Sequence, residues 1–301
     1  MAESIRKRIS FNPQRKVDWR DSSVKSIQNI IHVAGSPDEH WIAETTEKIG
    51  DWRNIARSVY IRWAITINAM EVSQNYYKKL SPETALETKA MRVKDGVPCL
   101  VNMATWTGAE ASENYQIAQQ PISAYAFTDM YGVIEDIIFD SYGIFLENNP
   151  LTILKGTDFK AQRKLFHSRN KKPDEWQEAW RIRYNSWRKK RLYDGLSAVM
   201  KAYWNSAGLK EPSNYKMTDI KDWAGTIFMF GELRNHIVHS AQYVSEKLEN
   251  ACEIKGSMNF SFKSEELLEV DLFHLMAIEC FIDQYLTALN LALIEMVRGE
   301  A

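Results

Sequence analysis

The apolar residues of this chain recur mostly every three or four positions, which is the period of helices that bury one face. This spacing predicts helices over about residues 36–50, 51–80, 122–147, 173–206, 219–249 and 265–297. The low numbers of Gly (13) and Pro (8) also favour long helices, because both residues interrupt them. The predicted fold class is therefore all-α.

Helix-start signals appear twice in the first third of the chain. Residues 36–39 read Ser-Pro-Asp-Glu, which places Ser at the N-cap and Pro at the first helical position. Residues 81–83 read Ser-Pro-Glu and predict a short helix that ends near Gly96. Gly50 is expected to separate the two helices that come before it. Residues 97–104 fit either a buried strand or a packed loop.

The helical pattern is most regular after Pro121. Four long helices joined by short or moderate connections predict a helix bundle over residues 121–301. Residues 1–120 are predicted to form an additional N-terminal helical region. Between the last two helices, residues 256–262 fit either a small hairpin or an extended loop.

Composition and charge narrow the class of protein. With 38 Lys and Arg against 39 Asp and Glu, the net charge is −1, so a nucleic-acid site must come from local clustering of charge. The three Cys lie far apart, which excludes a disulfide scaffold and fits a reducing compartment. The first 20 residues are basic but lack the apolar stretch of a secretory signal. We therefore expect a cytoplasmic protein.

The most apolar segment spans residues 272–297. Glu279 and Asp283 lie in the middle of it, where a membrane-spanning helix would rarely carry acids. We expect a buried helix there and no membrane partner.

Residues 231–240, Gly-Glu-Leu-Arg-Asn-His-Ile-Val-His-Ser, hold the candidate chemistry. On a helical wheel Arg234 lies at or beside the apolar face, and Val238 falls within that face. A buried guanidinium needs an anionic partner, for which Glu135 and Asp136 on the first bundle helix, residues 122–147, are candidates.

The outer side of the same helix has a different character. Asn235 and His239 are neighbours there, one turn apart. Phe228 and Tyr243 lie on that side as well, so it combines polar with apolar residues. This combination predicts a second contact surface, such as a dimer interface.

The types of residue in this segment fit RNA cleavage without a metal ion. A His near neutrality can take the proton of a ribose 2′-hydroxyl, while an Arg stabilises the charge that develops on phosphorus. An adjacent Asn can orient a phosphate oxygen or hold the Arg. The products would be a 2′,3′-cyclic phosphate and a 5′-hydroxyl, and DNA would be refused because it lacks the nucleophile.

Residues 234–239, Arg-Asn-His-Ile-Val-His, resemble the Rx4–6H motif of the HEPN superfamily, with the polar residue that often follows its Arg. The resemblance covers about residues 121–301 and implies a HEPN-like four-helix bundle. It also implies a homodimer in which two motifs form one cleft, and a metal-independent endoribonuclease that acts as a toxin or anti-phage defence effector. Carried onto this chain, the catalytic residues are Arg234, His239 and, in support, Asn235. RNA is the implied substrate, and an antitoxin or regulatory protein is a further implied partner.

One departure from the family's pattern limits what the resemblance implies. HEPN toxins that are paired with nucleotidyltransferase antitoxins often have Tyr two residues after the His, where this chain has Ala241. We therefore do not expect the antitoxin-catalysed nucleotidylation of that position.

Two neighbours of the motif are candidate assisting residues, His236 and Glu232. Glu232, His236 and His239 also have the i, i+4, i+7 spacing of three metal ligands, but a solvated face is the more frequent meaning of such spacing. We expect no metal and no cofactor. The alternative function is a non-catalytic HEPN-like module that binds RNA, a nucleotide or a partner protein.

A basic, aromatic stretch covers residues 163–191, with eleven Lys and Arg and three Asp and Glu. Its candidate RNA-binding residues are Arg181, Arg183, Arg188, Lys189, Lys190 and Arg191. Trp176, Trp180, Tyr184 and Trp187 share one helix face. Because such a stripe is usually core, we expect at least three of these four rings to be buried.

Overall fold

The computed structural model describes residues 29–213, 219–254 and 258–299, and this part of the chain is mostly helical. The helices are α1 (His40–Tyr77), α2 (Gly108–Asn148), α3 (Lys160–His167), α4 (Pro173–Leu192), α5 (Leu196–Ala207), α6 (Ile220–Val238), α7 (Glu246–Cys252) and α8 (Leu272–Arg298). The strands are β1 (Ala85–Lys94) and β2 (Val97–Thr107). The expectation of a helical protein is confirmed, and the small two-stranded sheet is an addition to it.

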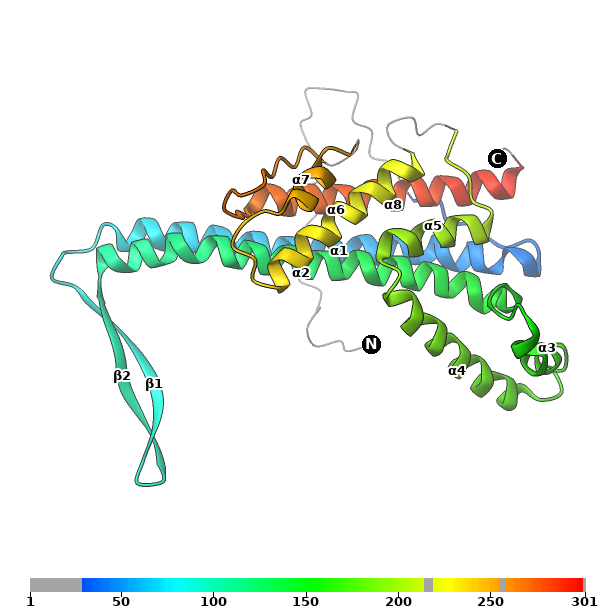
Figure 1. The fold of residues 1–301 in the computed structure, drawn as a ribbon, viewed down its shortest axis with the longest axis horizontal. Coiled ribbons are helices and arrows are strands. Elements are labelled where there is room, and N and C mark those ends of the chain that lie inside the picture. The colour runs from blue at the N-terminus through cyan, green and yellow to red at the C-terminus, as the bar shows by residue number, and fades with distance from the viewer. Residues whose placement is uncertain (1–28, 214–218, 255–257, 300–301) are drawn as a thin grey trace.

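The longest helices, α1 and α2, lie side by side, and α5, α6 and α8 lie along one side of them (Figure 1). We call these five helices the bundle. Large side chains fill the space between them, and those that are almost fully buried include Phe127, Phe139, Tyr203, Trp204, Phe230 and Tyr285. Burying each such side chain contributes about 1.5–3 kcal/mol, so the core accounts for most of the stability of the fold.

The helix α8 forms a central part of this core. Among the described residues it alone is long and apolar enough to cross a membrane, but 72% of its most apolar window is buried inside the bundle. Its N-terminus is fixed by a capping box between Asp271 and His274. The expectation of a buried helix over this segment is confirmed, although the helix begins at Leu272 rather than near residue 265.

A hairpin extends from the far end of α1 and α2 (Figure 1). Strands β1 and β2 pair antiparallel from Ala85–Thr107 to Lys94–Val97, and we call residues 85–107 the hairpin arm. The turn is formed by Asp95 and Gly96, with φ of 51° and 76°. Positive φ at both positions is the requirement of a type I′ turn, which Asp-Gly satisfies well.

The arm corrects two expectations. Residues 81–83 open no helix, because the chain enters β1 there. Residues 97–104 do form a strand, but the strand is largely exposed rather than buried.

In the first part of the chain, α1 continues through Gly50 without the break expected there, because the flanking Ile49 and Trp52 are buried on the same helix.

The helix α2 begins at Gly108, well before the expected start at residue 122, and it continues through Pro121. Thr107 and Glu110 form a capping box at its N-terminus. The expected division between residues 120 and 121 therefore falls inside one continuous helix.

Two predicted long helices are each divided in the structure. The segment 173–206 breaks at Gly195, whose φ of 80° suits glycine. The segment 219–249 breaks after Val238, and the chain reverses through Ser240, with φ of 53°. Residues 255–257 lie outside the described part of the chain, and residues 258–262 form a turn and an extended loop.

Helices α3 and α4 diverge from the end of α2 (Figure 1). The ring of Trp187 on α4 is buried, with its centroid 4.9 Å from that of Tyr142 on α2. Trp180 and Tyr184 are half-buried and pack against the edge of the core, while Trp176 lies further out. The expectation that at least three of the four rings belong to the core is met in part: Trp187 is buried in the core, and Trp180 and Tyr184 pack against it while partly exposed.

Candidate functional site

Arg234 and Asn235 lie on the same wall of a cleft between α2, α6 and the corner that joins α4 to α5. The cleft has a volume of about 670 Å³. The Arg234 Nη1 donates a hydrogen bond to the Asn235 Oδ1 over 3.2 Å, which fits the second of the two roles considered for Asn235, that of holding the Arg. Across the cleft, α2 contributes Tyr131 and Glu135. The motif's Arg and Asn therefore face a space large enough for a nucleotide.

Tyr131 adds a polar group that the sequence did not single out. The pKa of its phenol is raised to about 12, chiefly by burial and then by Glu135 and Glu232, while Arg234 acts in the opposite direction. Gly231 lets the phenol approach α6, because a Cβ at this position would lie 3.2 Å from the Tyr131 oxygen. At neutral pH the hydroxyl is protonated, so it presents a hydrogen-bond donor beside Arg234.

The corner between α4 and α5 forms the other side of the cleft. Arg191 pairs with Asp194 over 2.7 Å, and Lys201 is exposed nearby on α5. Tyr193 also lines the cleft, and 92% of its surface is exposed. Basic side chains and an exposed ring thus surround Arg234 on this side.

His239 occupies a different position from its motif partners. It is the C-cap of α6, and its backbone N–H donates to the Asn235 carbonyl over 3.0 Å. Its side chain is exposed, does not line the cleft, and makes no hydrogen bond or ion pair with the described residues. The structure therefore brings Arg234 and Asn235 together, and leaves His239 free at the end of the same helix.

His236 and Glu232 are held by structural contacts. The two ring nitrogens of His236 lie 2.8 Å from the Glu232 carbonyl and 2.8 Å from the Ser245 Oγ. Ser245 is the N-cap of α7, so this imidazole joins the end of α6 to the start of α7. The carboxylate of Glu232 pairs with Lys247 over 2.9 Å.

The positions of Glu232, His236 and His239 bear on whether these three residues could bind a metal ion together. In the described ranges, no group of three or more His, Cys, Asp or Glu is arranged to hold a metal ion. Glu232 and His236 are occupied by the contacts that join α6 to α7, and His239 lies apart from them.

Apolar side chains are exposed close to His239. Phe228 is 39% exposed, Val238 48% and Tyr243 54%, and Tyr243 forms a β-bridge with Leu267, which is itself exposed. The wheel placed Val238 in the core, and this is wrong because the helix ends there and turns away. Val238 lies at the end of α6 next to His239, the bridge joins Tyr243 to Leu267, and Phe228 lies further back on α6 at the cleft. We call these four exposed residues together the α6 apolar surface.

The basic residues predicted on α4 are mostly engaged with the protein itself. Arg181 binds Glu178 through two hydrogen bonds, of 2.8 and 2.7 Å. Arg183 donates to the Ile153 carbonyl over 3.2 and 2.7 Å, and its guanidinium lies 4.2 Å from the ring centre of Phe159. Burial lowers the pKa of Arg183. These two arginines fix local structure.

The remaining candidates are more accessible. The guanidinium of Arg188 lies 5.1 Å from the ring centre of Phe139, and Arg191 borders the cleft. Lys189 and Lys190 are exposed and have no acidic partner among the described residues. Of the six predicted RNA-binding residues, Arg191 lines the same cleft as Arg234, and Lys189 and Lys190 are exposed to solvent.

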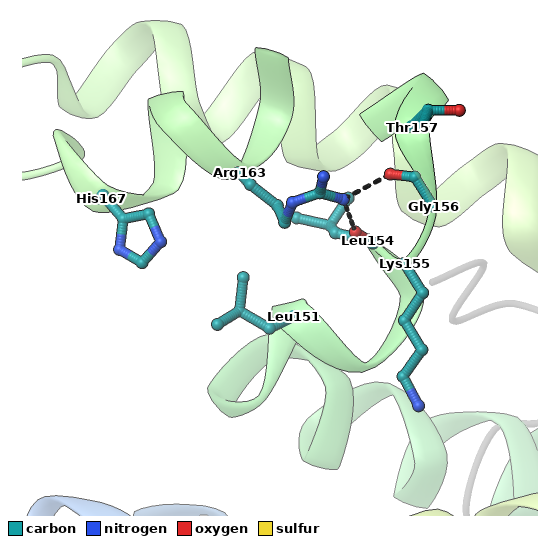
Figure 2. Close-up of a pocket in the computed structure, with 7 residues that line it drawn as sticks. All are labelled: Leu151, Leu154, Lys155, Gly156, Thr157, Arg163 and His167. Atoms are coloured by element: carbon teal, nitrogen blue, oxygen red, sulfur yellow. Dashed lines mark hydrogen bonds between the residues drawn. The ribbon is translucent and has the colours of Figure 1, made fainter. Parts of the chain in front are cut away.

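A second, shallower pocket of about 500 Å³ lies between α3 and the loop after α2 (Figure 2). Arg163 and His167 come from α3, and Lys155 comes from the loop. The sequence signal for this pocket is a run of basic residues almost without acids, but its position next to the buried Leu154 came only from the structure. No protein-family model, no curated protein and no solved structure matches this chain.

Proposed function

We propose that this chain is a metal-independent endoribonuclease with a HEPN-like bundle, and that it acts as a homodimer. The observation that carries the proposal is the arrangement at the end of α6. Arg234 and Asn235 are joined in a cleft of about 670 Å³, and His239 stands exposed and without a partner in the described residues. The three groups needed for cleavage of a ribose phosphate are thus available at one end of one helix.

The contrast between the two histidines of the motif supports a chemical role for His239. His236 bridges two elements through both ring nitrogens. His239 makes no such contact, so the fold has no evident need for its imidazole. A free imidazole near neutrality can accept a proton from substrate.

A second copy of the chain completes the proposed site. Within one protomer His239 does not line the cleft that holds Arg234 and Asn235. The α6 apolar surface lies next to the motif, and exposed apolar surfaces of this kind favour protein contacts. A twofold contact there would bring the motifs of two protomers together.

The proposed reaction needs no cofactor. His239 removes the proton of the ribose 2′-hydroxyl, and that oxygen attacks the adjacent phosphorus. The bond between phosphorus and the 5′-oxygen breaks, and the leaving oxygen takes up a proton. Arg234 stabilises the negative charge on the phosphoryl oxygens, and Asn235 holds the guanidinium in place. The products are a 2′,3′-cyclic phosphate and a 5′-hydroxyl.

In a cytoplasmic setting such an activity destroys RNA, which fits the proposed role as a toxin or an anti-phage defence effector. An antitoxin or regulatory protein would restrain it. Expression of the parent chain is expected to stop cell growth, while expression of His239→Ala is not.

Purified protein tests the reaction directly. We expect cleavage of RNA in the presence of EDTA, with 2′,3′-cyclic phosphate ends, and no cleavage of an all-deoxy substrate. His239→Ala and Arg234→Ala should each lower the rate by about 10²-fold or more. His40→Ala, which changes another exposed histidine at the start of α1, is the matched control. Inhibition by EDTA, or full activity in His239→Ala, would overturn the proposal.

The non-catalytic alternative has one observation in its favour. The cleft contains Arg234, Asn235 and Tyr131 without His239, and its volume is within the usual range of small-molecule sites. A nucleotide that binds to this cleft in Arg234-dependent fashion, in a protein that cleaves no RNA, would establish that function instead.

A further inference from the structure

We infer that α3 and the loop before it form a separate binding surface for the phosphodiester backbone of single-stranded RNA, with Arg163 as its fixed anchor. We call this surface the α3 patch, and its residues are Lys155, Lys160, Arg163, Lys164, His167, Arg169 and Lys171. The inference rests on the proposed function in one respect, which is that RNA is the ligand.

The charge of this segment is one-sided. Residues 155–172 contain seven Lys and Arg, one His and a single acid, Asp158. Within the described residues only Lys172 has an acidic partner, Glu175 at 2.8 Å. The other basic side chains have no carboxylate within ion-pair distance among the described residues, so their positive charge is not neutralised by the protein.

The neighbouring helix α4 differs in this respect. There Arg181 pairs with Glu178, and Arg191 pairs with Asp194. Each of these pairs must be broken, or its charge shared, before the arginine can bind a phosphate. Within the described part of the chain the α3 patch has no ion pair to break, although Arg163 and Arg169 donate to backbone carbonyls. Its unpaired lysines add to the positive charge that Lys189 and Lys190 supply on α4, so the patch attracts a polyanion on this side of the molecule.

Arg163 gives the patch a fixed centre. Its Nη1 donates to the carbonyls of Leu154 and Gly156 over 2.5 and 2.6 Å. Figure 2 shows the guanidinium held between α3 and this loop, with His167 and Leu151 on the other side of the pocket. The Nε and Nη2 groups make no hydrogen bond to the described residues, so they remain available to phosphate oxygens.

The surroundings favour a nucleic acid over a membrane. A membrane-binding helix places large apolar side chains in solvent beside its basic ones. Leu151 at the pocket wall is 40% exposed, but from there to residue 181 the described chain exposes no other large apolar side chain, and Leu165 and Phe166 on α3 are half-buried. Among the residues that line the pocket, His167 is the one with an aromatic ring, and it is exposed, so it offers a surface on which an unpaired base can stack.

The test compares two double variants that each remove two exposed lysines. Lys160→Ala with Lys164→Ala changes the α3 patch, and Lys78→Ala with Lys79→Ala changes the far end of α1 by the same net charge. Both are made in the full chain carrying His239→Ala, so that binding is measured without cleavage. The probe is a fluorescent 16-nucleotide oligouridylate, and its anisotropy is recorded at several salt concentrations.

We expect the α3 double variant to bind about tenfold more weakly, with a salt slope lower by about 1.4, because each phosphate contact on a single strand contributes about 0.7. The control variant should bind as its parent does. Equal binding by the two variants would overturn the inference while leaving the proposed function intact. Binding of phosphatidylserine vesicles or polyglutamate, with none of the RNA, would also overturn it.

The cleavage assay keeps the two proposals separate. If the chain with His239 restored cleaves no RNA but the α3 double variant still loses binding, the proposed function fails and the α3 patch stands. If the chain cleaves RNA but the α3 double variant binds as its parent does, the proposed function stands and the α3 patch fails.

Discussion

The bundle and the hairpin arm place the same kinds of residue in opposite environments. In the bundle, Leu289 and Met130 are fully buried. On the arm, Leu100 and Met91 are paired across the two strands and are 69% and 66% exposed. An isolated two-stranded hairpin is only marginally stable in water. The difference teaches that the bundle stabilises this chain, while the apolar side chains of the arm contribute little to its folding.

The largest expected effect on the free energy of unfolding comes from comparing two side-chain truncations, one in the bundle and one on the arm. Phe230 is 0% exposed, with its ring centre 5.6 Å from Phe127 and 5.4 Å from Phe281. Phe230→Ala should lower the free energy of unfolding by about 3–5 kcal/mol, because it removes apolar contacts and leaves a cavity. Leu100→Ala on the arm should change it by less than about 0.5 kcal/mol. Urea denaturation followed by circular dichroism measures both.

The contrast between bundle and arm would be contradicted if Leu100→Ala lowered the free energy of unfolding as much as Phe230→Ala does. That result would mean that the arm is packed against something in solution. A dependence of the loss on protein concentration would then identify the covering surface as another copy of the chain.

A smaller effect separates the two histidines at the end of α6, one held by the bundle and one free. His236→Ala should destabilise the protein by about 1–3 kcal/mol, because it removes two contacts and leaves the Ser245 hydroxyl with only its cap bond from the Leu248 N–H. His239→Ala should leave the free energy of unfolding within about 0.5 kcal/mol of the parent. Thermal melting of the two variants side by side gives the comparison. A loss of the same size in His239→Ala would argue that its imidazole has a structural role.

Sequence periodicity predicted the long helices better than the arm, although α1, which was assigned to a separate N-terminal region, packs in the bundle against α2 and α8. The stripes that became α2, α6 and α8 were visible because one face of each helix is buried along most of its length. The arm has little burial to impose a pattern, so the apparent Ser-Pro-Glu helix start misled the prediction. The Asp95-Gly96 dipeptide was the signal that could have revealed the hairpin, because it suits a type I′ turn.

The candidate site was predictable where it depends on local spacing and not where it depends on tertiary contacts. The neighbours Arg234 and Asn235 form a hydrogen bond, which was one of the two roles considered for Asn235. The wall formed by Tyr131 and the corner at Tyr193 comes from segments far apart in the sequence, which spacing along one helix does not reveal. The pairing of Arg181 with Glu178 shows the same limit, since counting charges over a segment does not say which are neutralised.

The smallest expected effect is on how the stability of the protein depends on pH, and it comes from a histidine of the bundle and not from the arm. His274 at the start of α8 packs between the rings of Phe260 and Phe262, with centroid distances of 4.7 and 5.1 Å. Burial lowers the pKa of this imidazole below its usual value of 6.5, although Asp271 acts in the opposite direction. Between the lowered pKa and 6.5 the unfolded chain binds more protons than the folded one, so this group makes stability fall as the pH drops below 6.5.

The contribution of His274 cannot exceed about 1.4 kcal/mol per pH unit, the limit for one proton. Urea denaturation at several pH values between 7.5 and 5 should show a weaker pH dependence in His274→Gln than in the parent. Leu100→Ala, which changes only the arm, should keep the parent's dependence. An unchanged slope in His274→Gln would show that this imidazole protonates as easily in the folded protein as in the unfolded chain. The start of α8 would then be as open to water as the arm, and the boundary between the two regions would have to be drawn further inside the bundle.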